Sequence, residues 1–380
     1  MKHPSTGFGH TDVGNTIEKK STTHNNPNQN SRPNLLSHKL LMTTAIVILN
    51  WNGKKYLQQF LPILIENTIL SDVEIIVADN ASTDSSLSVL KENFPTVKTI
   101  VLDRNYGFAG GYNEALAQID AEYYILLNSD VEVTPGWLVP LISYMDEHKD
   151  VAVCQPKIHS FYKRTHFEHA GAAGGYIDRF GFPFCRGRIL GTAEEDKGQY
   201  DSVADIFWAT GACFVVRSNI YWQVGGLDEE FFAHMEEIDF CWRLKSRGHR
   251  IACVPDSTVF HIGGGTLNVE SPHKTYLNFR NNQLMLYKNL PTKLLKNTMF
   301  WRSIFDYIAA VQLFITGKPK NAVSVLKARA DFKRMQPNFE AKRKENILYS
   351  TSDNQSDIFQ KSIVIEYYLK GKKTFRSLIK

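Results

Sequence analysis

The sequence predicts an α/β protein with a mostly parallel central sheet, flanked by helices, and with a helical C-terminal extension. Three observations support this prediction. Short apolar runs alternate with segments of helical periodicity between residues 43 and 155, as they do in βαβ units. Polar residues close several of these runs, at the edge of a parallel sheet where ligands bind. Beyond residue 276, apolar residues recur at helical spacing.

The elements of the sheet can be assigned in order. The apolar run 44–49 is typical of a central parallel strand. A helix is expected next, because the apolar residues from Leu57 to Ile65 share one helical face, and Pro62 should bend it. The same reasoning places strands at 73–78, 97–102 and 123–127, with helices from 84 and over 110–119 between them. A mixed, glycine-rich segment follows over 151–275, with a strand expected at 212–216 and a helix over 240–246.

The composition excludes several classes of protein. The 380 residues are 43% hydrophobic and 22% charged, which is ordinary for a globular protein. The five cysteines form no C-x-x-C pair, which argues against a zinc module and fits a reducing compartment. No apolar stretch reaches the length of a membrane span. Residues 1–41 are expected to be disordered, and they lack the apolar core of a signal peptide. The predicted location is therefore cytoplasmic.

Basic residues concentrate in the last hundred positions. Residues 281–380 contain 19 Lys and Arg against 7 Asp and Glu, whereas residues 1–280 contain 25 against 32. A basic tail suits an anionic membrane surface or a nucleic acid, although it also serves plain solubility. The aromatic, amphipathic stretch 304–311, preceded by Trp301 and Arg302, favours a membrane surface over a nucleic acid. The alternative is that this helix only packs on the main domain.

Two common nucleotide-binding motifs are absent from the sequence. No G-x-G-x-x-G follows the first strand, which argues against a dinucleotide fold of the dehydrogenase type. No G-x-x-x-x-G-K-[ST] occurs either, so the chain is not a P-loop enzyme.

The ends of two predicted strands carry carboxylates. The fourth strand ends in Asn128-Ser129-Asp130, where Asp130 could hold a divalent cation and, through it, a phosphate. Taken alone, this triplet would only make a turn. The second strand ends at Asp79, whose carboxylate could accept a hydrogen bond from the imide N–H of uracil or thymine. Ser82 or Asp84 would cap the following helix.

Glycines surround the start of the third predicted helix, in the segment from Asn105 to Asn113. Gly107, Gly110 and Gly111 allow close approach of the backbone, and a helix N-terminus offers free N–H groups to an anion. Three glycines exceed what a plain turn needs, so the segment is expected to face a ligand.

Three carboxylates occupy four positions at Glu236, Glu237 and Asp239. Acidic residues at a helix start gain from its dipole, and Asp239 with Arg243 forms an i, i+4 pair, so a structural role is one interpretation. Adjacent carboxylates beside a cleft also raise one another's proton affinity, which is how a general base is tuned. His261 stands before Gly263, Gly264 and Gly265. That position favours a site over a purely structural histidine.

Together these segments resemble glycosyltransferase family 2 over residues 43–290, nearest to the bacterial rhamnosyltransferase and galactofuranosyltransferase-like enzymes. Each motif is weak alone, but their joint occurrence in one order is specific. The segments that carry the resemblance are Val47-Ile48-Leu49-Asn50-Trp51-Asn52-Gly53, Asp79-Asn80-Ala81-Ser82-Thr83-Asp84, Asn105 to Asn113, Asn128-Ser129-Asp130, Gly225-Gly226-Leu227-Asp228 and Glu236 to Arg243.

The resemblance implies a GT-A fold and inverting sugar transfer. The donor would be a pyrimidine nucleotide-diphosphate sugar, either dTDP-rhamnose-like or a UDP-sugar. The acceptor would be a hydroxyl of a glycan or lipid-linked acceptor in bacterial cell-surface polysaccharide synthesis. Asp79 matches the position that reads the base, and Asp130 matches the last acid of the D-x-D motif. His261 matches a histidine that completes the site for Mg²⁺ or Mn²⁺ in some relatives.

Glu237 matches the general base, with Glu236 as the other candidate. The sequence departs from the family pattern at Asn128, which replaces the first acid of D-x-D, and at the base, where Asp is more common. The acceptor side is expected at Trp208, Asp239 and Trp242. The expected donor-binding residues are Asn50, Asn52, Asp79, Asn105, Gly107, Gly110, Asn113, Asn128, Ser129 and Asp130.

The resemblance also suggests four regions. These are a disordered extension (1–41), a nucleotide-sugar-binding subdomain (42–155), an acceptor-binding and catalytic subdomain (156–280) and a basic helical region (281–380). An enzyme with this layout could rest on the inner membrane face, where a lipid-linked acceptor would be found, and would not bind nucleic acid.

Two other functions stay open. A non-catalytic membrane- or anion-binding protein of the same fold is one. A sugar nucleotidyltransferase is the other, but it needs a glycine-rich basic loop after the first strand. This sequence has one glycine, Gly53, followed by Lys54 and Lys55.

Overall fold

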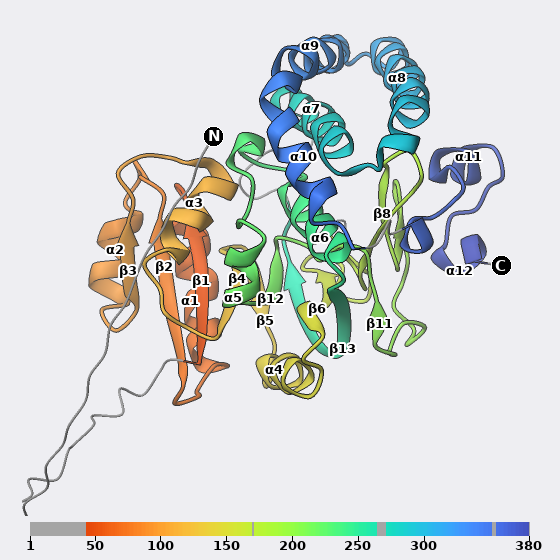
Figure 1. Ribbon diagram of the computed structural model, residues 1–380. Helices are drawn as coiled ribbons and strands as arrows, with labels where there is room; N and C mark the ends of the chain where they lie inside the picture. Colours follow the sequence, from red (N-terminus) through yellow and green to blue (C-terminus); the bar gives the residue numbers. More distant parts are fainter. Residues whose placement is uncertain (1–42, 169–170, 264–270, 352–354, 380) are drawn as a thin grey trace, which may run out of the picture. The chain divides into compact units, whose positions relative to one another are not determined.

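A mixed nine-stranded sheet forms the centre of the computed structural model, which describes residues 43–168, 171–263, 271–351 and 355–379. The chain divides into residues 1–39 and 40–380, and the elements below all belong to the second unit. The order across the sheet is β11-β13-β6-β12-β4-β1-β2-β3, with β5 beside β13 (Figure 1). The strands are β1 (Thr44–Asn50), β2 (Val73–Asp79), β3 (Lys98–Val101), β4 (Tyr123–Asn128), β5 (Val131–Val133), β6 (Val151–Ser160), β11 (Ala204–Asp205), β12 (Cys213–Arg217) and β13 (Arg250–His261).

The predicted parallel core of the sheet is confirmed. β1 pairs in parallel with β2 and β4, and β2 pairs in parallel with β3. β12 runs antiparallel to both β4 and β6, and β13 runs parallel to β6. The continuous apolar runs arise because each central strand is buried on both faces. In β1, Ile46 and Ile48 face one hydrophobic core, whereas Ala45 and Val47 face the other.

Helices cover both faces of the sheet. Apolar side chains of α1, α2 and α4 fill one core, and those of α3, α5 and α6 fill the other. These helices are α1 (Lys54–Glu66), α2 (Ser86–Asn93), α3 (Gly107–Leu116), α4 (Leu138–Glu147), α5 (Ser218–Gln223) and α6 (Glu236–Ser246). A four-stranded meander of β7 (Gly175–Ile177), β8 (Pro183–Cys185), β9 (Arg188–Ile189) and β10 (Thr192–Ala193) lies between β6 and β11 in the chain.

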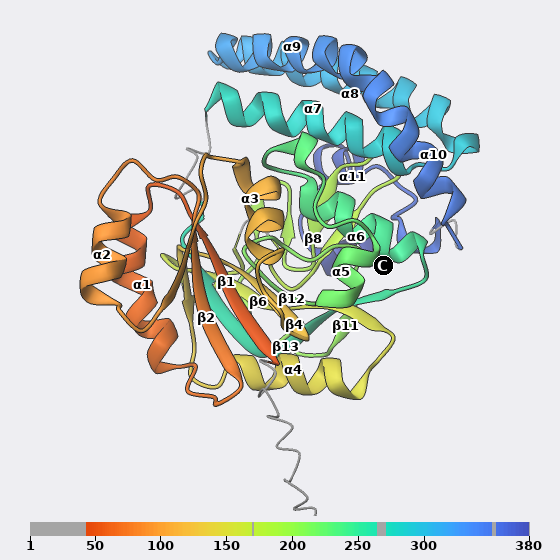
Figure 2. The same ribbon diagram turned by 60° about the vertical axis from the view of Figure 1, so that its left-hand side comes forward.

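The C-terminal region is helical, as predicted. Among the residues the structure describes, no helix is long and apolar enough to span a membrane. In Figures 1 and 2, α7 lies between the sheet and the antiparallel pair α8 and α9. The helices are α7 (Pro272–Asn289), α8 (Thr292–Ile315), α9 (Pro319–Met335), α10 (Glu340–Leu348), α11 (Ile363–Tyr368) and α12 (Phe375–Ile379), with single 3₁₀ turns at 229–231, 336–339 and 355–357.

Several element boundaries differ from the prediction. α3 begins at Gly107 rather than Gly110 and ends at Leu116. α6 begins at Glu236, four residues before the apolar residue at which it was expected, because its first turn is built from acidic residues. α1 runs unbroken through Pro62. The extension 1–41 and two of the three glycines after His261 lie outside the described residues.

Candidate active site

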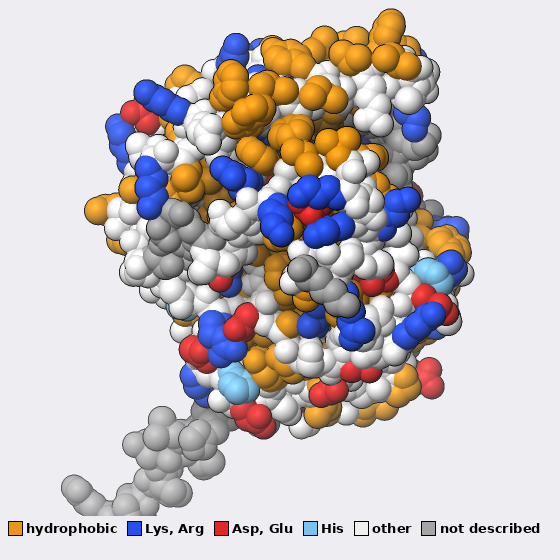
Figure 3. Space-filling view, turned by 90° about the vertical axis from the view of Figure 1, so that its right-hand side faces the viewer, with side chains coloured by type: hydrophobic (Ala, Val, Ile, Leu, Met, Phe, Trp, Pro, Cys, Tyr) orange, Lys and Arg blue, Asp and Glu red, His pale blue; other side chains and the backbone are white. Residues whose placement is uncertain are grey.

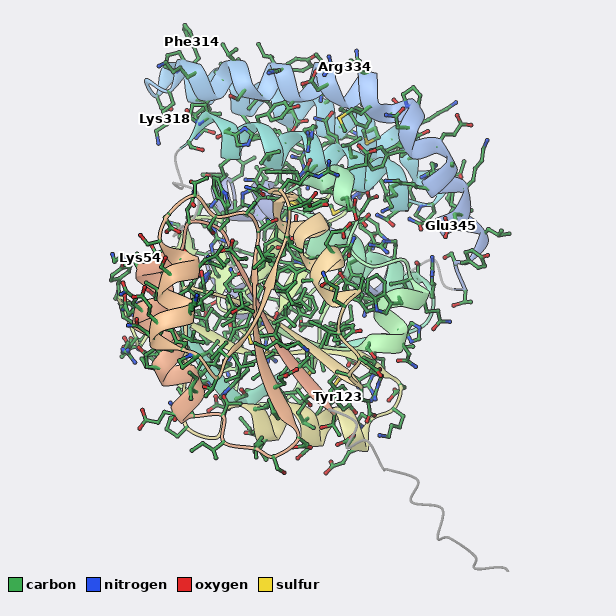
Figure 4. All side chains as sticks on the ribbon, turned by 90° about the vertical axis from the view of Figure 1, so that its left-hand side faces the viewer. Lys54, Tyr123, Phe314, Lys318, Arg334 and Glu345 are labelled. Carbon is green, nitrogen blue, oxygen red and sulfur yellow. The ribbon has the colours of Figure 1, made fainter. Side chains whose placement is uncertain are left out.

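The polar residues that close the strands meet at one edge of the sheet. Asn50 pairs with Asp79 in register, and Leu49 pairs with Asn128. His261, the last residue of β13, pairs with Val131 and so lies beside Asp130. α6 leads into β13 through a short turn, so its N-terminus returns to the same edge. In Figure 4, Tyr123 marks the edge of the sheet at which β4 begins, and Lys54 lies near the opposite edge, just after the end of β1. The edge near Lys54 faces α7.

The first two loops of this edge are tied together. Asp79 is fully buried, and its Oδ1 accepts a hydrogen bond from Asn50 Nδ2 at 3.0 Å. Its Oδ2 accepts from the backbone N–H of Ser82 at 2.9 Å. Asn52 adopts a φ of 52°, and its Oδ1 accepts from Thr83 N at 2.7 Å. The loops therefore hold Asp79 in place, while each carboxylate oxygen keeps capacity for a second donor.

Asn50 contributes an unsatisfied polar atom to this site. Its side chain is fully buried, and Oδ1 has no hydrogen-bond partner among the described residues. A Cβ atom at position 53 would lie 2.3 Å from Asn50 Oδ1 and 3.5 Å from Ser129 Oγ, so only Gly53 fits between these loops. Buried polar atoms are normally hydrogen-bonded, so an orphaned acceptor at a sheet edge points to a ligand donor.

Asp130 and His261 are brought together, as the sequence predicts. Asp130 Oδ1 lies 3.2 Å from His261 Nε2, and Glu168 Oε2 lies 3.4 Å from His261 Nδ1. All three side chains are buried. Burial lowers the pKa of His261, but the carboxylates of Asp130 and Glu168 outweigh it and raise the pKa to about 10. In this arrangement His261 holds its proton tightly, and that proton would have to leave before an imidazole nitrogen could bind a metal ion.

The fit of a metal ion to this cluster is partial. Carboxylate oxygen and imidazole nitrogen are suitable ligands for a divalent ion such as Mn²⁺. However, no group of three or more His, Cys, Asp or Glu side chains in the described parts of the chain is arranged to hold one. Asp130 and His261 could supply two protein ligands, and the rest would have to come from a substrate or from water.

Two acidic side chains open α6 at this edge. Glu236 is only 3% exposed, Glu237 is partly exposed, and the Oε2 atom of each is buried without a hydrogen-bond partner in the described structure. Burial raises the pKa of Glu237 to about 7. Burial, and next the charge of Glu237, raise the pKa of Glu236 well above its ordinary value. Both carboxyl groups therefore hold their protons more tightly than a free glutamate does, and Glu237 is the more accessible of the two.

The loop before the acid pair has a strained backbone. Phe232, His234 and Met235 adopt φ values of 65°, 70° and 73°, in the left-handed region that residues with a side chain rarely occupy. Such conformations cost on the order of 1–3 kcal/mol each, and they persist only where the surroundings fix them. The strain lies directly before Glu236 and Glu237, so it sets where the two carboxylates point.

A single buried asparagine of α7 holds this loop. The Nδ2 group of Asn281 lies within hydrogen-bond distance of the carbonyl oxygens of Phe231 (2.9 Å), Ala233 (2.8 Å) and His234 (2.8 Å). Its neighbour Arg280 donates to the Phe231 carbonyl at 3.0 Å. Asn281 is fully buried, so its amide is held in place beside these carbonyl groups. The residue is therefore a positioning residue for the acid pair.

We expect Asn281→Ala to lower the rate of the reaction at this site by about 10-fold to 100-fold, because the carbonyl groups lose their donor and the strained loop can relax. The pH–rate profile should also change, since the pKa of Glu237 depends on its burial. Asn278→Ala is the matched control, because that asparagine lies on the same helix and donates only to its own helix, at Lys274 O. An unchanged pH profile in Asn281→Ala would contradict the positioning role.

The N–H groups at the start of α3 donate to other groups of the protein. The N–H groups of Phe108 and Ala109 donate to the carbonyl of Phe232 at 2.7 and 3.3 Å. Gly107 N donates to Asn105 Oδ1 at 2.8 Å. A Cβ atom at Gly107 would lie 2.5 Å from the Phe232 ring. These three donors already have protein acceptors, and Gly107 leaves room for the loop of the acid pair, while the ligand-binding role of this helix start stays a prediction.

Asn113 and Gly110 also make structural contacts. Asn113 Nδ2 donates to Leu227 O at 2.8 Å, and Asn113 Oδ1 accepts from Tyr221 Oη at 2.7 Å. A Cβ atom at Gly110 would lie 3.5 Å from the side chain of Glu229. This part of the segment packs α3 against the turn at 225–229, and a donor-binding role for Gly110 and Asn113 stays a prediction.

The three residues expected on the acceptor side are buried. Trp208 and Trp242 belong to the hydrophobic core. Asp239 is fully buried and bonds Arg243 at 2.9 Å and Lys288 at 2.8 Å. All three side chains have little exposed surface, and their assignment to the acceptor side stays a prediction. The i, i+4 pair of Asp239 with Arg243 is confirmed.

Sequence reasoning missed Glu168, His234 and Asn281. Glu168 lies in an irregular segment, and only tertiary folding brings it to His261. His234 is partly exposed with a buried Nε2 atom, and desolvation, then the charges of Lys274 and His273, lower its pKa to about 4, so it is neutral beside the acid pair. Asn281 did leave a signal, because it stands between Leu277 and Leu284 on the apolar face of the predicted helix.

Comparison with known proteins identifies the family and the fold of the chain. The description of the family whose model matches residues 45–225 is glycosyl transferase family 2. The N-acetylglucosaminyl-diphospho-decaprenol L-rhamnosyltransferase of Mycobacterium tuberculosis is 27% identical over 231 residues, which cover 57% of this chain and 75% of that protein. The dTDP-rhamnosyl transferase RfbF of Shigella flexneri is 25% identical over 233 residues, covering 57% of this chain and 71% of that protein.

Two solved structures share the fold. GalNAc-T7 with UDP, GalNAc and Mn²⁺ superposes with a TM-score of 0.52 at 18% identity, over 77% of this chain and 55% of that chain. S. aureus TarS in complex with UDP superposes with a TM-score of 0.50 at 18% identity, over 87% of this chain and 92% of that chain. Both have the GT-A fold.

Proposed function

Because this chain is a glycosyltransferase of family 2 with a GT-A fold, we propose that it inverts the anomeric centre of the sugar that it transfers. The donor is a pyrimidine nucleotide-diphosphate sugar, and the acceptor is a hydroxyl of a glycan or of a lipid-linked glycan. The observation that carries the proposal is the buried acid pair at the start of α6, whose Glu237 has a pKa of about 7 and shares the sheet edge with Asp79 and Asp130.

Relatives favour a deoxysugar donor. The names of the M. tuberculosis and S. flexneri proteins specify L-rhamnosyl and dTDP-rhamnosyl transfer. On this chain, Asp79 would read the pyrimidine, because an ionised carboxylate accepts from the imide N–H that uracil and thymine share. The orphaned Asn50 Oδ1 offers a second acceptor beside it. A dTDP-linked 6-deoxyhexose is therefore the first donor to test.

Glu237 would act as the general base. A sugar hydroxyl is a poor nucleophile until it loses its proton, and a base works best with a pKa near the working pH. As the acceptor oxygen bonds to the anomeric carbon, its proton passes to Glu237. The bond to the diphosphate breaks on the opposite face, and the diphosphate leaves with the electron pair. Glu236 stays protonated and keeps the local charge from doubling.

Asp130 and His261 would hold a divalent ion together with the donor diphosphate. Such an ion stabilises the negative charge that grows on the leaving group. Asp130 anchors this end of the site, because its own backbone carbonyl accepts from Ile262 N at 3.2 Å and fixes the two loops relative to each other. Asn128 and Ser129 are partly exposed in the same loop, and we expect them to contact the diphosphate.

A thermal-shift panel tests donor class and metal use together. We expect dTDP and UDP to raise the melting temperature of the full chain more than GDP and ADP do, because Asp79 accepts from a pyrimidine imide. At a ligand concentration one hundred times its dissociation constant, the stabilisation is about 2.7 kcal/mol. The shift should grow with Mn²⁺ and fall when the ion is chelated. Equal shifts for purine and pyrimidine nucleotides would contradict the role of Asp79.

A further inference from the structure

The helical pair α8 and α9 carries an exposed apolar face. On α8 the exposed fraction is 60% for Phe300, 58% for Ile308, 67% for Phe314 and 77% for Ile315. Trp301, Tyr307 and Val311 on α8 and Val323 and Leu326 on α9 are also exposed. Figure 3 shows hydrophobic side chains gathered along the top of the molecule, where α8 lies, and Figure 4 shows Phe314 at the tip of the pair, pointing outward. We call these nine side chains the outer face.

The inner side of α8 combines apolar contacts with a buried ion cluster: Phe305 packs against Phe180 and Phe182, and Arg302 and Asp306 are buried. Asp306 is fully buried, and its carboxylate accepts from Arg302 Nε at 2.8 Å and from Arg329 of α9 at 3.0 Å. Arg302 also donates to Asn282 of α7. A helix that only packs on the main domain turns its apolar side inward. Packing therefore accounts for the inner side of α8 but not for the outer face.

The charges around the outer face have one sign. Between residues 291 and 339 the acidic residues are Asp306 and Asp331, and both are buried. The exposed charged residues of this segment are Lys293, Lys296, Lys318, Lys320, Lys327, Lys333 and Arg334. An anionic partner is therefore attracted along the whole pair, and no exposed carboxylate of the segment opposes it.

We propose that the outer face of α8 and α9 docks on a lipid bilayer surface that carries anionic headgroups. Apolar and aromatic side chains flanked by lysines are the composition that enters the headgroup region. A protein partner of opposite charge would need a matching apolar groove, whereas a bilayer supplies apolar depth and negative charge without shape matching. The evidence for docking is the outer face and the basic residues around it.

Docking would bring the active site to the membrane. α7 lies between the outer face and the carboxyl edge of the sheet (Figures 2 and 4), and its Asn281 holds the loop of the acid pair. An acceptor glycan on a lipid carrier would then meet Glu237 close to the bilayer. This consequence rests on the proposed function, whereas the docking does not.

Flotation of the full chain with vesicles tests the docking. One set of vesicles is phosphatidylcholine, and the other contains phosphatidylcholine and phosphatidylglycerol in equal parts. We expect the wild type to float with the anionic vesicles at low salt, and binding to fall as salt is added. The triple variant Val311→Gln, Phe314→Gln and Ile315→Gln should bind at least 10-fold more weakly. The matched control is Ile69→Gln, Leu70→Gln and Val101→Gln, which removes three exposed apolar side chains elsewhere and should float like the wild type.

Two further measurements separate the outcomes. Nucleotide-induced thermal shifts should be equal in the wild type and the outer-face variant, so that a failed flotation and a failed donor assignment are distinguishable. Light scattering reports whether the outer face instead joins two copies of the chain. A wild type that does not float, an outer-face variant that floats equally, or a wild-type dimer that the variant converts to monomer would each overturn the proposal.

Discussion

Replacing Glu237 by glutamine should lower the rate of sugar transfer by about 100-fold to 10,000-fold, which is the usual contribution of a general base. Glutamine keeps the shape of the side chain but cannot take the proton of the acceptor hydroxyl. Donor binding should survive, because Asp79 and Asp130 are unchanged. The measurement is the release of nucleoside diphosphate from the donor in the presence of acceptor, alongside the thermal shift with nucleotide.

The wild-type enzyme should show the matching pH dependence. The base must be ionised, so the rate at low substrate concentration should rise with pH through about 7, where Glu237 titrates. Glu229→Gln is the matched control, because this glutamate lies near α3 in the same part of the chain but outside the acid pair. A pH profile that is flat between 5.5 and 8.5 would argue against Glu237 as the base.

The stability of the Glu237→Gln variant separates loss of the base from loss of the fold. The pKa of Glu237 in the folded chain lies above its ordinary value of 4.5, so the folded state binds the extra proton between those values. Folding stability of the wild type therefore falls as pH rises from 4.5 through about 7. The glutamine variant has no carboxyl group at this position, so its stability does not fall with pH for this reason. It should be at least as stable as the wild type at pH 8, and a clear loss of stability there would mean that the inactive variant is misfolded.

Replacing Asp130 by asparagine should be the second large effect. We expect the rate of transfer to fall by about 100-fold to 1,000-fold, the size seen when a preorganised stabiliser of transition-state charge is removed. The Mn²⁺-dependent part of the thermal shift should vanish with it, because a neutral amide is a poor ligand for a hard cation. Asparagine keeps the contact with His261 at 3.2 Å possible, so the loops should stay in place.

Asp256→Asn provides the control for Asp130→Asn. Asp256 is an exposed residue of β13, the same strand that delivers His261, and it takes no part in the site. This variant should respond to nucleotide and Mn²⁺ as the wild type does. If Asp130→Asn retained the full metal response, the metal would have to be held elsewhere, and the proposed ligand pair would be wrong.

The sequence was most informative where a buried strand ends. The apolar run before Asn128 is short enough to be a strand buried on both faces, and the residues after such a strand emerge at the carboxyl edge. This reasoning is local, and it placed Asp130 at the carboxyl edge and the acid pair at a helix start, whereas only the family resemblance suggested that His261 joins Asp130. The parallel order of the first strands follows from the same alternation.

Long-range contacts set the limits of the sequence reasoning. Nothing near Gly107 reveals that the carbonyl of Phe232 occupies the start of α3. Likewise, the acidic residues of α6 look alike in the sequence. In the structure, Asp239 is buried in an ion pair with Lys288, whereas Glu237 is partly exposed. Glu168 reaches His261 from a segment without periodicity. These roles depend on which distant segments meet, and a single sequence does not report that.

The stereochemistry of the product tests the account most directly. If Glu237 acts as a base and the acceptor attacks opposite the diphosphate, the anomeric configuration of the product is the reverse of that in the donor. The coupling constants of the anomeric proton and carbon, measured by NMR on the purified product, distinguish the two configurations. We expect inversion. Retention would mean either that the enzyme first forms a bond to the sugar or that the acceptor attacks on the face from which the diphosphate leaves. Either route would contradict the role given to the acid pair.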